Sequence, residues 1–146
     1  MADTNVQSID DATHTANIWL RDVQEAAGLK DRESAYRALR GVLLSIRDRL
    51  PVEPASQLGA QLPMLIRGIY YEQFSPAHQP KTVRSKTEFL TLIAETFDPV
   101  DALLADPDRA TQAVLSVVNT HIDAGEAQKA RHMLNDDLKE LWPLAA

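Results

Sequence analysis

The chain has no cysteine and few glycines or aromatic residues. Of its 146 residues, 5 are glycine and only 5% are Phe, Trp or Tyr. The absence of cysteine excludes a disulfide framework, a thiolate metal site and a cysteine nucleophile, and it favours a reducing compartment. Alanine, leucine, arginine, glutamate, aspartate and glutamine are abundant instead. Because these residues favour helix over sheet, the composition predicts a helical protein.

Long hydrophobic runs are also missing. No apolar stretch approaches the roughly 18 residues that would span a bilayer. The amino-terminal sequence MADTNVQSIDDATHT is polar and acidic, and it lacks the basic and apolar regions of an export signal. We therefore expect a cytoplasmic protein with no membrane partner. Its hydrophobic content of 45% is sufficient for one compact domain with a sizeable core.

An excess of positive charge is absent as well. The chain has 15 Lys and Arg against 21 Asp and Glu, for a net charge of −6. Binding to a phosphate backbone draws its affinity from clustered basic side chains, so nucleic acid is not an expected partner. One line of arginines (Arg37, Arg40 and Arg47) falls within about an 80° arc of a predicted helix. We interpret it as a solvated face, with an acidic partner or nucleic acid as the functional alternatives.

Two parts of the chain resemble each other. The stretch WLRDVQEAA at residues 19–27 is echoed by FLTLIAETF at residues 89–97, and similar apolar positions recur after both. An open solenoid needs about three or more repeats to be stable, so two copies favour a duplicated unit that closes on itself. We predict an all-α fold: a compact helical domain of two pseudo-symmetric, duplicated helical lobes.

The predicted organisation is a single helical domain at residues 14–146 that follows a disordered tail at residues 1–13. The first repeat covers about residues 14–74, a linker covers 75–86, and the second repeat covers about 87–143. Apolar side chains at helical spacing are expected in one shared core. The expected core residues are Ile18, Trp19, Leu39, Val42, Ile46, Leu62, Ile66, Phe89, Leu90, Val114, Val118, Leu138 and Leu141.

Caps and prolines mark the predicted helix ends. In the first repeat, helices are expected from His14 or Thr15 to Gly28, from an Asp31 cap to Pro51, at residues 54–60 and from Pro63. The second repeat is punctuated in the same way. Its expected elements are a helix at residues 87–97, a turn or short helix at 99–105, a helix capped by Asp106, another capped by Asp123 that ends near His132, and a last one at 136–142 capped by Asn135.

No common catalytic signature is present. The chain has no glycine-rich phosphate loop, no G-x-S-x-G elbow, no H-E-x-x-H and no calcium loop. His121 falls on an apolar helix face, where we expect a core histidine bonded to a backbone carbonyl. His132 and Asp136 are four residues apart, but a helix start at Asn135 separates them. We assign no catalytic residue, no metal site and no cofactor.

The densest group of functional side chains lies at residues 62–76, LPMLIRGIYYEQFSP. The candidate binding residues, called the aromatic cluster below, are Arg67, Tyr70, Tyr71, Glu72 and Phe74. Adjacent tyrosines cannot both face the core, so one is expected to pack while the other lies in a groove with Phe74. Packing alone is the alternative interpretation. Gly68, in a helix interior, suggests a neighbour too close for a side chain.

Three longer motifs surround this cluster: DR-x-x-AYRALR-x-VL, RDRLPV-x-x-A-x-x-LGAQLP and RGIYYE-x-x-x-P. With them the chain resembles the bacterial domain-of-unknown-function family 2267, from residue 19 to the terminal LNDDLKELWP. The resemblance implies a small helical bacterial protein of unassigned biochemical role, and it brings no catalytic residues. The second repeat lacks a counterpart of RGIYYE, so a site is expected in the first repeat.

The leading functional hypothesis is a small noncatalytic interaction module, regulatory or stress related, that binds another protein or itself through the aromatic cluster. The rival hypothesis is a small-ligand binder or enzyme with a pocket between the lobes. In that alternative, Arg67, Tyr70, Glu72 and His121 would converge on one cavity.

Overall fold

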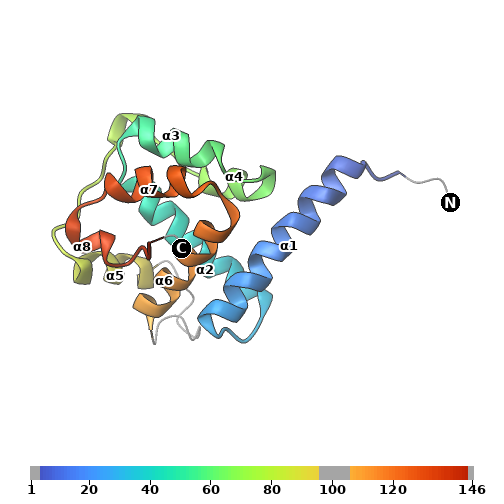
Figure 1. Cartoon of the computed structure of the whole chain (residues 1–146), viewed down its shortest axis with the longest axis horizontal. Coiled ribbons are helices and arrows are strands. Elements are labelled where there is room, and N and C mark those ends of the chain that lie inside the picture. Colours follow the sequence, from blue (N-terminus) through green and yellow to red (C-terminus); the bar gives the residue numbers. More distant parts are fainter. Residues whose placement is uncertain (1–3, 96–105, 145–146) are drawn as a thin grey trace.

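The structure is a computed structural model that describes residues 4–95 and 106–144. The described part contains eight α-helices and one 3₁₀-helix, η1 (Pro76–His78), and it contains no strand. The prediction of an all-α fold is confirmed. Most of the helices form one compact body, from which the first helix projects (Figure 1). No helix in the described ranges is long and apolar enough to cross a membrane.

Helix α1 (Gln7–Ala27) ends at a glycine, as the sequence indicates. Gly28 is in the left-handed conformation with φ of 67°, and its backbone N–H donates to the carbonyl of Glu25. The N–H of Leu29 donates to the carbonyl of Gln24 at 2.9 Å. These two bonds satisfy carbonyl groups that the last helical turn leaves free.

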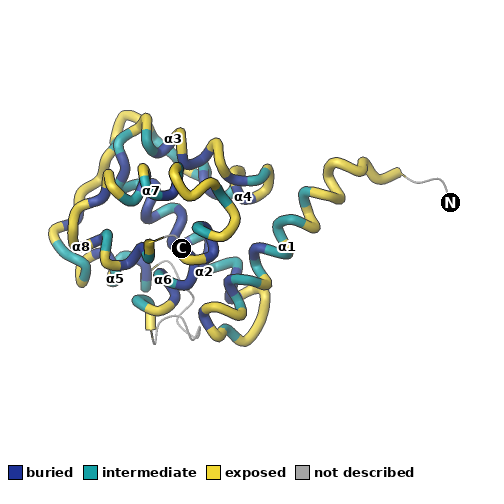
Figure 2. The backbone as a smooth tube through the Cα atoms, in the orientation of Figure 1, coloured by how far each residue is buried: buried dark blue, intermediate teal, exposed yellow. Residues whose placement is uncertain are grey.

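The start of α1 differs from the prediction. The helix begins at Gln7 and not near His14 or Thr15, so the second half of the expected tail at residues 1–13 is helical. These turns project away from the body and are mostly exposed (Figures 1 and 2). Once packing fixes the rest of the helix, each further residue costs little to add. The Gln7 side chain also donates to Asp11 at 2.7 Å.

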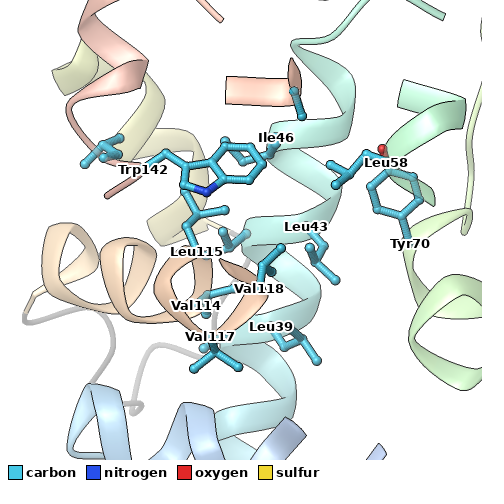
Figure 3. Close-up of a cluster of buried hydrophobic side chains, with 14 of the residues drawn as sticks. Leu39, Leu43, Ile46, Leu58, Tyr70, Val114, Leu115, Val117, Val118 and Trp142 are labelled. Carbon is cyan, nitrogen blue, oxygen red and sulfur yellow. The ribbon is translucent and has the colours of Figure 1, made fainter. Parts of the chain in front are cut away.

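Helix α2 (Arg32–Asp48) lies at the centre of the fold and packs on α1, α4, α5 and α6. As predicted, the Asp31 side chain caps it by accepting a hydrogen bond of 2.8 Å from the backbone N–H of Ser34. Figure 3 shows Leu39, Leu43 and Ile46 of α2 among side chains of the neighbouring helices. The apolar face of this segment is buried, including the expected core residues Leu39, Val42 and Ile46 and also Ala35, Leu43 and Leu50.

Two short helices follow, α3 (Val52–Ala60) and α4 (Met64–Tyr70). The second half contains α5 (Lys86–Glu95), α6 (Pro107–His121), α7 (Ala124–His132) and α8 (Asp136–Lys139). Asp106, Asp123 and Asn135 cap the last three, as predicted. The last helix is shorter than expected. The predicted end of α5 near Phe97 and the predicted element at residues 99–105 lie outside the described residues.

The predicted core is largely confirmed. Eleven of the thirteen expected residues are buried, whereas Ile18 and Leu90 are only half-buried. Ile18 was placed on the wrong face of α1, since Trp19 and Val23 supply its buried stripe. Helices of the two halves pack on one another, α1 on α6, α2 on α5 and α6, and α3 on α7. The pseudo-symmetric relation of two lobes stays a prediction.

Candidate functional site

Tyr70 of the aromatic cluster lies in the core. Its side chain is fully buried, and its hydroxyl donates a hydrogen bond of 2.7 Å to the Ala55 carbonyl in α3. Burial raises the pKa of the Tyr70 hydroxyl far above its usual value. The hydroxyl therefore stays protonated near neutral pH and connects α4 to α3.

Arg67 closes the carboxyl end of α3. Its guanidinium donates to the backbone carbonyls of Gly59 at 3.2 Å and Leu62 at 2.8 Å. Carbonyls in the last turn of a helix have no partner within the helix, and a cationic donor suits them well. The position of Arg67 is thus explained by the α3–α4 connection.

Tyr71 and Phe74 pack against each other at the edge of this region. Their ring centroids are 5.6 Å apart with an interplanar angle of 68°, an edge-to-face arrangement, and both residues are half-buried. The Tyr71 ring also covers Gly59, where an added Cβ would overlap the hydroxyl. The close approach inferred for Gly68 is wrong, because a Cβ there would meet no atom within 4 Å.

The predicted line of arginines on α2 is not an exposed basic face. Arg47 is only 3% exposed, because α4 and the segment after it cross over its side chain. Its Nη1 donates to the carbonyls of Tyr70, at 2.9 Å, and Glu72, while Nε and Nη2 donate to Asp48 at 3.0 and 2.8 Å.

The other two arginines of the line also lie near acidic side chains. Arg40 forms an ion pair of 3.0 Å with the Glu72 carboxylate. Arg37 lies near Glu33 at 3.7 Å.

Each polar member of the aromatic cluster thus has an internal partner. The hydroxyl of Tyr71, at 3.4 Å from the Ser56 carbonyl, makes the weakest of these contacts. The geometry therefore favours the packing interpretation of the cluster, in which it ties α4 to α2 and α3.

His121 occupies a site that the sequence did not indicate. Its Nε2 lies 2.7 Å from an oxygen of Asp22 in α1, and its ring stacks on Trp19 with centroids 4.7 Å apart. The expected backbone carbonyl partner is thus replaced by a carboxylate, and the side chain is 24% exposed. The bond to His121 lowers the pKa of the Asp22 carboxyl. The pair holds α6 to α1.

The four residues of the rival hypothesis do not come together in any cavity described below. Arg67, Tyr70 and Glu72 point to three separate partners in α3 and α2, whereas His121 belongs to the α1–α6 contact. Within residues 4–95 and 106–144, no group of three or more His, Cys, Asp or Glu could hold a metal ion. The geometry gives no support to a pocket formed by these four side chains.

A groove lies between α3 and α7, with a cavity volume of about 250 Å³. It is the contact region of two helices that lie far apart in the sequence. Its lining residues are Pro54, Gln57, Leu58, Glu126, Lys129, Ala130, His132 and Met133. Met133 is 46% exposed at its rim. Methionine packs adaptably, and it is frequent at surfaces that bind helices.

A second exposed apolar feature is the free half of α1. Ile9, which is 51% exposed, continues the stripe that is buried further along at Trp19, Val23 and Ala27. Ala12 and Ala16 connect the two parts, and the whole stripe falls within an arc of about 100° at 100° per residue. Val6 precedes it and is 61% exposed.

These features define a small all-helical protein with no recognisable catalytic constellation in its described residues. The chain belongs to the family described as "Uncharacterized conserved protein (DUF2267)", whose family model matches residues 16–141. The resemblance inferred from the sequence motifs is therefore confirmed. A search of curated proteins found no match. The family match begins at residue 16, so the projecting turns of α1 lie outside it.

Proposed function

We propose that this protein is a noncatalytic interaction module of the cytoplasm that associates with a second copy of itself. The free half of α1 of one copy would lie in the groove between α3 and α7 of the other. The observation that carries the proposal is the apolar stripe of α1, which continues without interruption from the buried half into the projecting half.

A continuous stripe indicates that both halves of α1 are built to be covered. The buried half packs on α2 and α6, whereas Val6 and Ile9 have no such cover. An amphipathic helix that binds a groove uses apolar anchors spaced three or four residues apart, and Ile9 and Ala12 have this spacing, with Val6 directly before the helix. Burial of one large aliphatic side chain contributes about 1.5–3 kcal/mol.

The groove has the matching apolar form. Leu58, Ala130 and Met133 give it an apolar floor and rim. The charged lining residues Glu126 and Lys129 form an ion pair of 3.2 Å with each other. The apolar contact, and not charge, therefore supports the match with the stripe of α1.

The partner helix has to come from another molecule. Helix α1 is continuous over 21 residues, and its free half points away from its own body (Figure 1). It therefore does not reach the groove of the same chain. A reciprocal exchange between two copies would fill both grooves.

Analytical ultracentrifugation over a concentration series tests this association. We expect the wild type to form a dimer, Ile9→Glu to remain monomeric because it places a charge in the apolar contact, and Met133→Glu to do the same from the groove side. The matched control is His14→Glu, which adds the same charge on the opposite face of α1, where the residue is exposed. It should dimerise like the wild type.

Mixing the two monomeric variants gives the sharper test. Ile9→Glu retains an intact groove and Met133→Glu retains an intact helix, so their mixture should form a heterodimer through one remaining contact. A wild type that stays monomeric at 1 mM would contradict the proposal, and so would dimers of Ile9→Glu. Equal loss of dimer in His14→Glu would show that net charge, and not the stripe, controls association.

A further inference from the structure

Arg49 follows α2 directly and has enclosed donors without acceptors. Its Nε and Nη1 are buried, and neither has a hydrogen-bond partner among the described residues. The guanidinium lies over the Phe89 ring at 5.8 Å from the centroid. Arg49 as a whole is half-buried, but these two nitrogens are enclosed. Enclosed polar atoms normally have a hydrogen-bond partner, because leaving one without a partner is costly. The chain thus supplies no acceptor to Nε and Nη1 among its described residues.

Arg49 lines a cavity of about 200 Å³ that is separate from the aromatic cluster. The cavity lies between the end of α2, the linker and the start of α8, and its other lining residues are Pro80, Lys81, Thr82, Val83, Met133, Asn135 and Leu138. Four of these side chains are apolar, and none of the lining residues is acidic. Asn135 is already used, since it caps α8 and donates to the Val83 carbonyl.

The charges near the cavity have both signs. The carboxylates of Asp48 and Glu88 act on Arg49, while Arg47 and Lys81 are paired with Asp48. Asp48 is bound by Arg47 at 2.8 Å, and Lys81 is a further 3.6 Å contact. Burial lowers the pKa of Arg49, while Asp48 and Glu88 oppose this effect, and a guanidinium still remains protonated in proteins.

The volume limits the size of an occupant. The cavity volume of about 200 Å³ is below the roughly 300–1,000 Å³ of most drug-like sites, which favours a small occupant. Because the other walls are largely apolar, the polar group of a ligand would have to lie beside Arg49 and Lys81. A hydrogen bond from a cationic nitrogen to a carboxylate oxygen is stronger than one between neutral groups.

We propose that this cavity binds a small carboxylate on a short apolar body, with Arg49 and Lys81 holding the carboxylate and Val83, Met133 and Leu138 covering the body. The cavity differs from the groove between α3 and α7 and takes a different class of ligand, although Met133 lines both. The variants at Arg49 and Lys81 therefore test the cavity without altering the groove.

Titration calorimetry and NMR titration of the full chain test the site with hexanoate as the probe. Hexanoate should bind saturably with one site per chain, and its neutral analogue hexanol should bind at least tenfold more weakly because it lacks the charge. Inorganic phosphate should also bind more weakly, since it has no apolar body. Shifts should appear at the signals of Arg49, Lys81 and Val83.

Arg49→Met removes the charge at similar length, and it should weaken hexanoate binding at least tenfold. The matched control is Arg32→Met, the same substitution at the exposed first residue of α2, the helix that Arg49 follows. It should leave binding unchanged. Lys81→Met offers a second test if Arg49→Met folds poorly, because Lys81 is half-exposed, and binding should fall severalfold.

Three results would overturn the proposal. The first is the absence of saturable hexanoate binding up to 50 mM, which would show that only water occupies the cavity. The second is equal affinity in the wild type and in Arg49→Met or Lys81→Met. The third is tighter binding of inorganic phosphate or hexanol than of hexanoate.

Discussion

Arg47 and Arg49 lie two residues apart at the end of α2, yet their surroundings are opposite. Arg47 is buried with donors satisfied by Asp48 and by two backbone carbonyls of the segment that crosses over it. Arg49 is half-buried, and two of its nitrogens have no acceptor among the described residues. A complete set of bonds indicates a structural role, whereas the incomplete set at Arg49 is the observation from which the carboxylate site is proposed.

The largest expected effect in this comparison is that of Arg47→Met. The substitution leaves the carbonyls of Tyr70 and Glu72 and the Asp48 carboxylate without their main partner. Breaking a buried ion pair on one side costs about 3–5 kcal/mol. Urea denaturation should show a loss of this size in the free energy of unfolding. A loss below about 1 kcal/mol would contradict the structural role of Arg47.

Tyr70→Phe should have the next largest effect on stability, in the α4 region that packs over Arg47. It removes the hydroxyl that bonds the Ala55 carbonyl and leaves this acceptor buried without a partner. We expect a destabilisation of about 1–3 kcal/mol by thermal and urea denaturation. Tyr71→Phe is the control, since its hydroxyl bond is long and exposed, and it should change stability by less than about 0.5 kcal/mol.

Arg49→Met should act in the opposite direction to Arg47→Met. Without ligand, it removes two enclosed donors that lack acceptors, and methionine keeps a contact with the Phe89 ring. We expect a gain of about 1 kcal/mol in the free energy of unfolding. A loss comparable to that of Arg47→Met would show that both arginines are structural.

Lys81→Met should have the smallest effect on stability. Its ammonium is 3.6 Å from Asp48 and 52% exposed, and such surface pairs contribute about 0–1 kcal/mol. Thermal denaturation should find little change in the midpoint. A large loss would mean that Lys81, and not Arg47 alone, neutralises Asp48.

Local signals made much of the fold predictable. Asp31, Asp106, Asp123 and Asn135 were each recognised as helix caps because a cap depends on the next three residues only. Gly28 marked the end of α1 for the same reason. The start of α1 was missed because its first turns are polar and carry only a short extension of the apolar stripe.

The candidate sites were less predictable. Tyr70 and Tyr71 could not be assigned to core or groove until the position of α3 was known. The sequence does not indicate that two nitrogens of Arg49 lack acceptors, because nothing in the local pattern distinguishes Arg49 from Arg47. His121 was recognised on an apolar face, but its partner Asp22 lies 99 residues away in the chain.

The positions of the helices and of their apolar faces follow from the amino-acid order alone, because hydrogen bonding and periodicity act over a few neighbouring residues. Which polar side chains find partners follows from how the helices pack. That outcome depends on segments remote in the chain. Tyr70 and Glu72 supply carbonyl acceptors to Arg47, whereas no described residue supplies one to Nε or Nη1 of Arg49.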